Sequence, residues 1–91
     1  MTAMRVAPGV HAREFGDEGV VIDVRRGVYF SLNAVANVVW KALAAGASIA
    51  VAVDAVVAQF DVDADVARTD TEALIAQLRE ARLIVDEGVG P

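Results

Sequence analysis

The sequence predicts an α+β domain, winged helix-turn-helix-like, in which a three-stranded antiparallel sheet is followed by three helices. Two observations lead to this fold class. Between residues 10 and 32, β-branched and aromatic residues are grouped between closely spaced turns that contain glycine, which is typical of short strands. From Asn33 onward the apolar residues recur with the period of a helix. We expect residues 1–91 to form a single domain, with a core at about 10–85 and flexible ends.

Short turns separate the expected strands. The strands are placed at Val10 to Phe15, at Val20 to Val24 and at Val28 to Leu32. The segments between them, 16–19 and 25–27, have the length of hairpin turns, so neighbouring strands are antiparallel and the first and third lie at the sheet edges. In the third strand, Val28, Phe30 and Leu32 share one face, and Tyr29 and Ser31 share the other.

Each expected helix has a start signal and an apolar face. Asn33 caps the first helix, which ends at Gly46, and Ser48 caps the second, which stops near Asp61. The third begins within 61–65, because carboxylates favour a helix N-terminus. Its apolar face comprises Ala67, Thr71, Leu74, Ile75, Leu78 and Ala81. The apolar tail that follows, Leu83 to Val85, is expected to pack on the core, and residues 86–91 to fray.

The composition excludes several classes of protein. The absence of cysteine rules out disulfides, thiolate zinc sites, iron–sulfur clusters and a cysteine nucleophile. The apolar stretch at 42–60 is interrupted by Gly46, Ser48 and Asp54, which argues against a membrane span. The first ten residues contain no apolar run of signal-peptide length. We therefore expect a cytoplasmic protein without a membrane segment.

The charge distribution argues against a nucleic-acid partner. The net charge is −5, and between Asp54 and Glu72 there are six acidic residues against one basic residue, Arg68. This surface would repel phosphate groups. A cationic or mainly apolar partner fits better.

Groups that could support catalysis are isolated. His11 is the only histidine and has no obvious acidic or nucleophilic partner nearby in the sequence. Ser31 lies on a strand and Ser48 caps a helix, so both have structural explanations. The acidic run at 61–65 lacks the glycine and the glutamate of a calcium loop. We expect no catalytic residues, no metal site and no cofactor, and therefore a binding protein rather than an enzyme.

Two segments carry a resemblance to a known family. The first, Tyr29 to Leu43, reads YFSLNAVANVVWKAL and joins a strand ending in Leu-Asn to a helix of small residues that contains Trp40. The second comprises Asp70, Leu74, Ile75 and Leu78, followed by Leu83-Ile84. In order and spacing these segments resemble the PqqD family, the recognition elements of ribosomal peptide-modifying pathways, over about Glu14 to Val85.

The chain departs from the family pattern at two positions. Ser48 is followed three residues later by Val51, so the acidic partner of a capping box is missing. Arg82 stands where the family often has glycine, before the closing apolar pair. Neither position belongs to the expected contact surface.

The resemblance implies a non-catalytic protein that binds the leader segment of a ribosomally made precursor peptide. Within that family, the chain is most like the stand-alone leader-binding protein of lasso peptide biosynthesis. The resemblance implies that its partners are a leader peptidase and a modifying enzyme such as a cyclase. The leader would add as a fourth strand to Val28 to Leu32, and the groove against the third helix would supply selectivity. The expected peptide-binding residues are Val28, Tyr29, Phe30, Ser31, Leu32, Asp70, Thr71, Leu74, Ile75 and Leu78. Some of the helical residues must belong to the core instead, and Trp40 is assigned to the core.

Two alternatives remain open at this point. A winged-helix DNA-binding protein would have the same order of elements, but its recognition helix needs a basic, polar face. In the expected third helix, Arg68, Arg79 and Arg82 are dispersed among acidic residues. The other alternative is a small dimerisation module that pairs its edge strand with a second copy of the chain.

Overall fold

The structure, a computed structural model, describes residues 3–87 and contains the expected three-stranded antiparallel sheet. Its strands are β2 (Val10–Phe15), β3 (Glu18–Asp23) and β4 (Val28–Leu32), in the spatial order β2–β3–β4. The turn between β2 and β3 has only two residues. Gly16 takes a φ of +67° at the first of them, which matches a type II′ turn. The expected strand order is confirmed, with the middle strand beginning at Glu18.

Three helices follow the sheet, as expected. They are α1 (Ala34–Ala44), α2 (Ile49–Gln59) and α3 (Ala64–Glu80). The two expected caps are present: Asn33 Oδ1 accepts from the Ala36 N–H at 2.9 Å, and Ser48 Oγ accepts from the Val51 N–H at 3.2 Å. Side-chain capping satisfies backbone donors that the first turn of a helix leaves unpaired.

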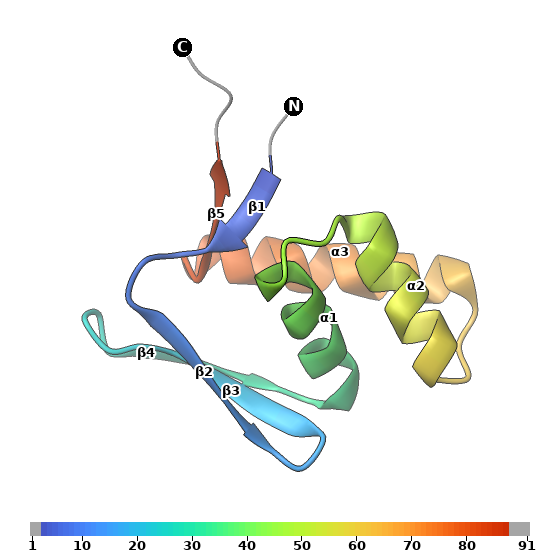
Figure 1. The fold of residues 1–91 in the computed structure, drawn as a ribbon, viewed down its shortest axis with the longest axis horizontal. Helices are drawn as coiled ribbons and strands as arrows, with labels where there is room; N and C mark the ends of the chain where they lie inside the picture. The colour runs from blue at the N-terminus through green and yellow to red at the C-terminus, as the bar shows by residue number, and fades with distance from the viewer. Residues whose placement is uncertain (1–2, 88–91) are drawn as a thin grey trace.

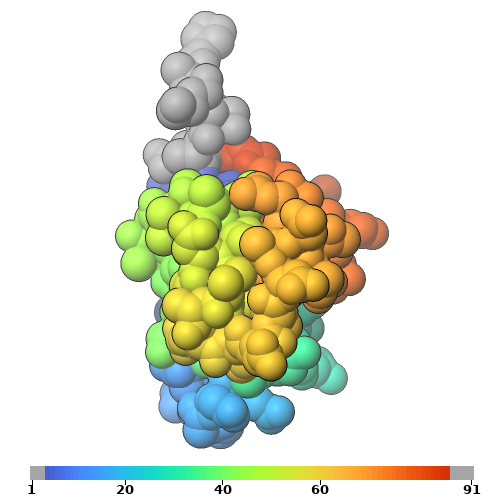
Figure 2. Space-filling model, turned by 90° about the vertical axis from the view of Figure 1, so that its right-hand side faces the viewer, coloured from blue at the N-terminus to red at the C-terminus, as the bar shows by residue number. Residues whose placement is uncertain are grey.

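The helices lie on one side of the sheet, and the core lies between them and that face (Figure 1). Buried core side chains come from the sheet, from all three helices and from the segment after α3; the largest include Val21, Val39, Leu43, Val56, Ile75, Leu78, Leu83 and Ile84. In the side view, α2 and the first turns of α3 cover one flank of the molecule, and the β2–β3 turn projects beyond them (Figure 2). The opposite sheet face is uncovered by helices. Within residues 3–87, no helix is long and apolar enough to cross a bilayer.

A second, two-stranded sheet corrects the expected element count. β1 (Ala3–Val6) pairs antiparallel with β5 (Ile84–Glu87), so that Arg5 lies opposite Val85. The expected tail at 83–85 packs on the core, but Ile84 and Val85 also belong to a strand. Residues 3–6 and 86–87, which were expected to be flexible, pair with one another in this sheet. The pairing joins segments from opposite ends of the chain, which no local pattern indicates. The remaining residues of the expected flexible ends, 1–2 and 88–91, lie outside the described residues.

The end of α3 accommodates Arg82 without glycine. Arg82 has a φ of +60°, in the left-handed region that glycine favours. Its N–H donates to the Arg79 carbonyl, and the Leu83 N–H donates to the Leu78 carbonyl, both at 2.9 Å. This pair of bonds is the Schellman motif, which satisfies the last carbonyls of a helix. The departure at Arg82 therefore leaves the expected helix end in place.

Candidate functional site

β4 forms an open edge of the three-stranded sheet, because its only strand neighbour in the described part of the chain is β3. Along an antiparallel strand, successive residues bond alternately to one side and to the other. In a hairpin with a two-residue turn, the two residues that flank the turn form backbone hydrogen bonds with each other, and here these are Phe15 and Glu18. The backbone groups of Glu18 and of every second residue after it therefore form hydrogen bonds with β2. The residues of β3 that bond to β4 are therefore Gly19, Val21 and Asp23.

The strand register then determines which backbone groups of β4 are free. Val21 lies opposite Phe30, and the two other bonding residues of β3 lie opposite Val28 and Leu32. The N–H and C=O groups of Tyr29 and Ser31 consequently point away from β3. The side chains of these two residues lie on the uncovered sheet face, where Tyr29 is 73% exposed. The edge offers two donors and two acceptors to an extended chain.

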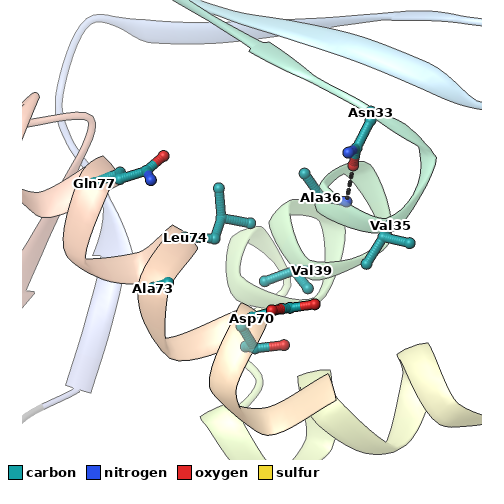
Figure 3. A pocket seen from close by; sticks show the side chains of 9 residues that line it. Asn33, Val35, Ala36, Val39, Asp70, Ala73, Leu74 and Gln77 are labelled. Atoms are coloured by element: carbon teal, nitrogen blue, oxygen red, sulfur yellow. Dashed lines mark hydrogen bonds between the residues drawn. The ribbon is translucent and has the colours of Figure 1, made fainter. Parts of the chain in front are cut away.

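A groove of about 330 Å³ lies between α1 and α3, where β4 ends. Asn33, directly after β4, lines it together with Val35, Ala36 and Val39 of α1 and Asp70, Thr71, Ala73, Leu74 and Gln77 of α3. Figure 3 shows Leu74 projecting from α3 toward α1, across from Val35 and Val39. A second hollow between β4 and α3 is lined by Phe30, Gln77, Glu80 and Ala81. Because both hollows include Gln77, an open surface follows α3 beside the free edge of β4.

Arg26 connects the β3–β4 turn to the end of α3. Its Nε donates to Asp23 Oδ2 at 2.7 Å, and its Nη2 donates to the carbonyls of Ala81 at 2.7 Å and Arg82 at 3.1 Å. The hydrogen bond from Arg26 holds the pKa of the buried Asp23 carboxyl below its ordinary value, although burial acts in the opposite direction. This contact holds β4 and the end of α3 at a fixed separation.

Asn37 performs a similar role at the β2–β3 turn. Its Nδ2 donates to Glu14 Oε2 at 3.0 Å and to the Asp17 carbonyl at 3.2 Å, so it fastens the β2–β3 hairpin to α1. The same bond, followed by that from Lys41, lowers the pKa of Glu14. Only glycine fits at position 19 beside the Asn37 side chain, because a Cβ there would lie 2.8 Å from Asn37 Oδ1. The sheet is therefore held against α1 by a buried amide.

Comparison with known proteins identifies the family. The family model described as coenzyme PQQ synthesis protein D (PqqD) matches residues 18–84. The chain belongs to the PqqD family. No curated protein sequence matches it.

Two solved structures resemble this PqqD-family chain along nearly its full length. "TbiB1 in Complex with the TbiA(beta) Leader Peptide" is 28% identical, with a TM-score of 0.81 over 96% of this chain and 99% of that chain. "Lasso peptide synthetase B1 complexed with the leader peptide" is 25% identical, with a TM-score of 0.81 over 91% of this chain and 98% of that chain. Both similar proteins were thus solved with a leader peptide bound.

The structure divides the expected peptide-binding residues of the PqqD-family chain into two groups. Val28, Tyr29, Phe30, Ser31, Asp70 and Leu74 are exposed or half-buried along β4 and α3. Leu32, Thr71, Ile75 and Leu78 are buried. Of the buried group, Thr71 lines the groove between α1 and α3, whereas Ile75 and Leu78 pack in the core and hold α3 in place.

Sequence reasoning missed several groove residues. Asn33, Val35, Ala36 and Val39 of the α1 wall and Ala73 and Gln77 of α3 were not among the expected site residues. A signal for the α3 wall does exist, because Asp70, Ala73, Leu74 and Gln77 have helical spacing and lie beside the buried stripe. The residues of α1 carry no comparable signal, since their spacing fits the core equally well.

Proposed function

We propose that this PqqD-family chain binds the leader segment of a ribosomally made precursor peptide in lasso peptide maturation. The leader adds to β4 as a fourth antiparallel or parallel strand and places side chains in the surface along α3. The observation that carries the proposal is the meeting of a free strand edge with an apolar groove at Asn33. The leader peptides bound to both similar proteins support it.

Selective binding of a leader requires both the free edge of β4 and the hollows along α3. Four outward backbone groups of Tyr29 and Ser31 would each contribute about 0.5–1.5 kcal/mol net as hydrogen bonds, and such bonds barely distinguish one sequence from another. Selectivity therefore comes from side chains that enter the hollows lined by Leu74 and by Phe30. In an extended peptide every second side chain points to the same face, so alternate residues would meet α3.

The chain acts in this proposal as a cytoplasmic, single-domain adaptor without catalysis, which presents the leader to a leader peptidase and a cyclase. Winged-helix DNA binding is disfavoured by α3 itself. Its sequence, ADVARTDTEALIAQLRE, contains more carboxylates than guanidinium groups, whereas a recognition helix needs a basic face.

Proline substitutions test the proposed edge. Tyr29→Pro and Ser31→Pro each remove an outward N–H without removing a hydrogen bond of the β3–β4 ladder, because the N–H that is lost points away from β3. Each is expected to weaken binding of the cognate leader peptide by about two- to tenfold, measured by fluorescence anisotropy. Circular dichroism checks that the fold persists.

The opposite edge supplies a matched control. By the same alternation, the N–H of Ala12 on β2 points away from β3, so Ala12→Pro makes the equivalent change at the other edge. It is expected to leave leader affinity unchanged. If Ala12→Pro abolished binding while both β4 variants bound like the wild type, the proposed site on β4 would be wrong.

A further inference from the structure

The second edge of the three-stranded sheet, formed by β2, is also open. Within residues 3–87 the only strand that pairs with β2 is β3. His11, Arg13 and Phe15 form the hydrogen-bonded pairs with β3, so the N–H and C=O groups of Ala12 and Glu14 point away from the sheet. Unpaired backbone groups of this kind can accept a further strand. β2 therefore offers two donors and two acceptors, as β4 does.

A hollow of about 460 Å³ lies between this edge and α1. Its lining comprises Ala12 and Glu14 of β2 and Asn37, Trp40, Lys41, Ala44 and Ala45 of α1. Ala12 lies opposite the core residue Val21, so its methyl group points to the helical side of the sheet. That methyl group is small and leaves the hollow open. On an added strand, the side chain of the residue paired with Ala12 would enter the hollow beside the ring of Trp40.

The other face of the same edge carries a positive charge. Arg13 lies between the two outward-bonding residues, and its side chain is on the uncovered sheet face, opposite Val20. It is exposed and forms no ion pair within the described residues. The carboxylate of Glu14 is already engaged by Asn37 and Lys41. Opposite charges on directly paired residues of neighbouring strands attract. An acidic residue opposite Arg13 is therefore favoured.

We propose that the β2 edge binds an extended segment of a partner protein by strand addition, at a site separate from that of the leader. The segment carries an apolar side chain that enters the hollow beside Trp40 and, next to it in sequence, a carboxylate that pairs with Arg13. Adjacent residues of a strand point to opposite faces, so these two side chains meet the two features together. With β4 also occupied, the chain holds two polypeptides at opposite edges of one sheet.

A second copy of the chain fits this edge poorly. Two antiparallel β2 strands paired about Ala12 would place Arg13 opposite His11 of the other copy, and no carboxylate would lie opposite either Arg13. The net charge of −5 on each copy adds a general repulsion. The partner is therefore a different protein.

A displayed library of random decapeptides without tryptophan tests this site. The library is selected on the immobilised wild type, on Ala12→Pro and on Tyr29→Pro, which remove equivalent outward N–H groups at β2 and β4. We expect a pool that Tyr29→Pro retains and Ala12→Pro loses, in which an apolar residue is followed or preceded by Asp or Glu. Circular dichroism checks the fold of Ala12→Pro. Ala12→Leu, which keeps the N–H but fills the hollow, is a second variant that does not depend on proline.

The lone tryptophan reports where an enriched peptide lies. Trp40 lines the hollow at β2 but not the groove between α1 and α3, so a peptide at β2 is expected to shift its fluorescence and a peptide at β4 is not. Ala12→Leu is expected to weaken binding about tenfold or more, because the apolar side chain loses its place. Arg13→Glu is expected to weaken binding about three- to tenfold, and a peptide with lysine in place of the carboxylate restores it.

The outcomes separate this site from the leader site. If no pool depends on Ala12, the inference is wrong, and a pool that depends on Tyr29 leaves the proposed function intact. An Ala12-dependent peptide that leaves Trp40 emission unchanged and binds Ala12→Leu normally also overturns the inference. A dimer of the free protein that Ala12→Pro dissociates would show that a second copy covers the edge instead. If the cognate leader binds Tyr29→Pro normally but not Ala12→Pro, the leader lies at β2 and both proposals fail.

Discussion

Arg26 binds Asp23 through a 2.7 Å contact between Nε and Oδ2, at a place where Asp23 is only 5% exposed. The backbone N–H groups of Arg25 and Arg26 donate to the other carboxylate oxygen, at 3.1 and 3.2 Å. The same Arg26 guanidinium reaches the carbonyl of Ala81 after α3. A single side chain thus joins a buried acid, a hairpin turn and a helix end.

Replacing Arg26 by lysine is expected to loosen this junction. A lysine ammonium is a compact point charge and cannot reproduce the planar fork that spans Asp23 and two carbonyls. The Tm should fall by several degrees, and leader affinity should fall because the separation of β4 and α3 is no longer held. Arg25→Lys is the control, since its guanidinium makes no hydrogen bond within residues 3–87. Equal behaviour of the two variants in melting and titration would contradict a role for the junction.

The free energy of unfolding should depend on pH through the carboxylate of Asp23. Because the pKa of Asp23 in the folded chain is lowered below 3.8, the contribution of the carboxylate to stability is complete above that pH. It is lost as the pH falls through the lowered folded-state pKa. Urea midpoints measured between about pH 2 and pH 7 should therefore drop at the acid end for the wild type and less steeply for Asp23→Asn. Parallel curves for the two proteins would show that Asp23 is not the group responsible.

Glu14 supplies a comparison for the acid experiment. Its pKa is also lowered, from 4.5, first by the hydrogen bond from Asn37 and then by Lys41. Glu14 is exposed, and exposed ion pairs contribute little because water screens them. Glu14→Gln is thus expected to change the acid dependence less than Asp23→Asn does.

Leu74 should be the most informative groove residue on α3. Leu74→Asp places a carboxylate in the apolar groove beside Asp70, so leader affinity should fall about tenfold or more while the fold persists. Val66→Asp, at a position of α3 that is 50% exposed, should bind like the wild type. Ile75→Asp should unfold the protein, because that side chain is in the core. Titration and circular dichroism distinguish these effects, and normal binding by Leu74→Asp would remove the groove from the site.

Gly19 should tolerate no side chain. In Gly19→Ala the new Cβ would lie 2.8 Å from Asn37 Oδ1 and 3.0 Å from the Arg13 carbonyl, so we expect a loss of about 1–3 kcal/mol in the free energy of unfolding. Asn37→Ala removes one of these contacts. The double variant should consequently lose less stability than the sum of the single changes, measured by urea unfolding. Additive losses would show that the Asn37 contact is not the cause.

The local patterns of the sequence predicted most of the fold. The β-branched run around Val21, the caps Asn33 and Ser48 and the carboxylates before α3 all act on nearby backbone, so their effects can be read from neighbouring residues. The β1–β5 pair depends instead on residues some eighty positions apart, such as Arg5 and Val85. A pairing of this kind is decided by the completed core, which brings the two segments together.

The site was less predictable than the fold, for a reason visible on α3. Helical spacing identifies Thr71, Leu74, Ile75 and Leu78 as one broad apolar face, but the structure turns Ile75 and Leu78 to the core and leaves Leu74 at the groove. A helix that contacts both a core and a groove divides its apolar face at an angle set by its packing. The orientation of α3 about its own axis is set by its packing against α1 and β4. It cannot be deduced from the spacing of residues along α3 alone.

The pairing of β1 with β5 also determines how this chain can be joined to other proteins. Ala3 lies opposite Glu87, so the chain enters and leaves the described fold at adjacent points (Figure 1). The β1–β5 ribbon lies on the side of α3 away from the β2–β3–β4 sheet. A chain with this geometry can be inserted into a surface loop of a larger protein, or tethered by either end, with its β4 edge still facing solvent. Such a cassette would let a peptide-recognition surface be transferred between enzymes without rebuilding its core.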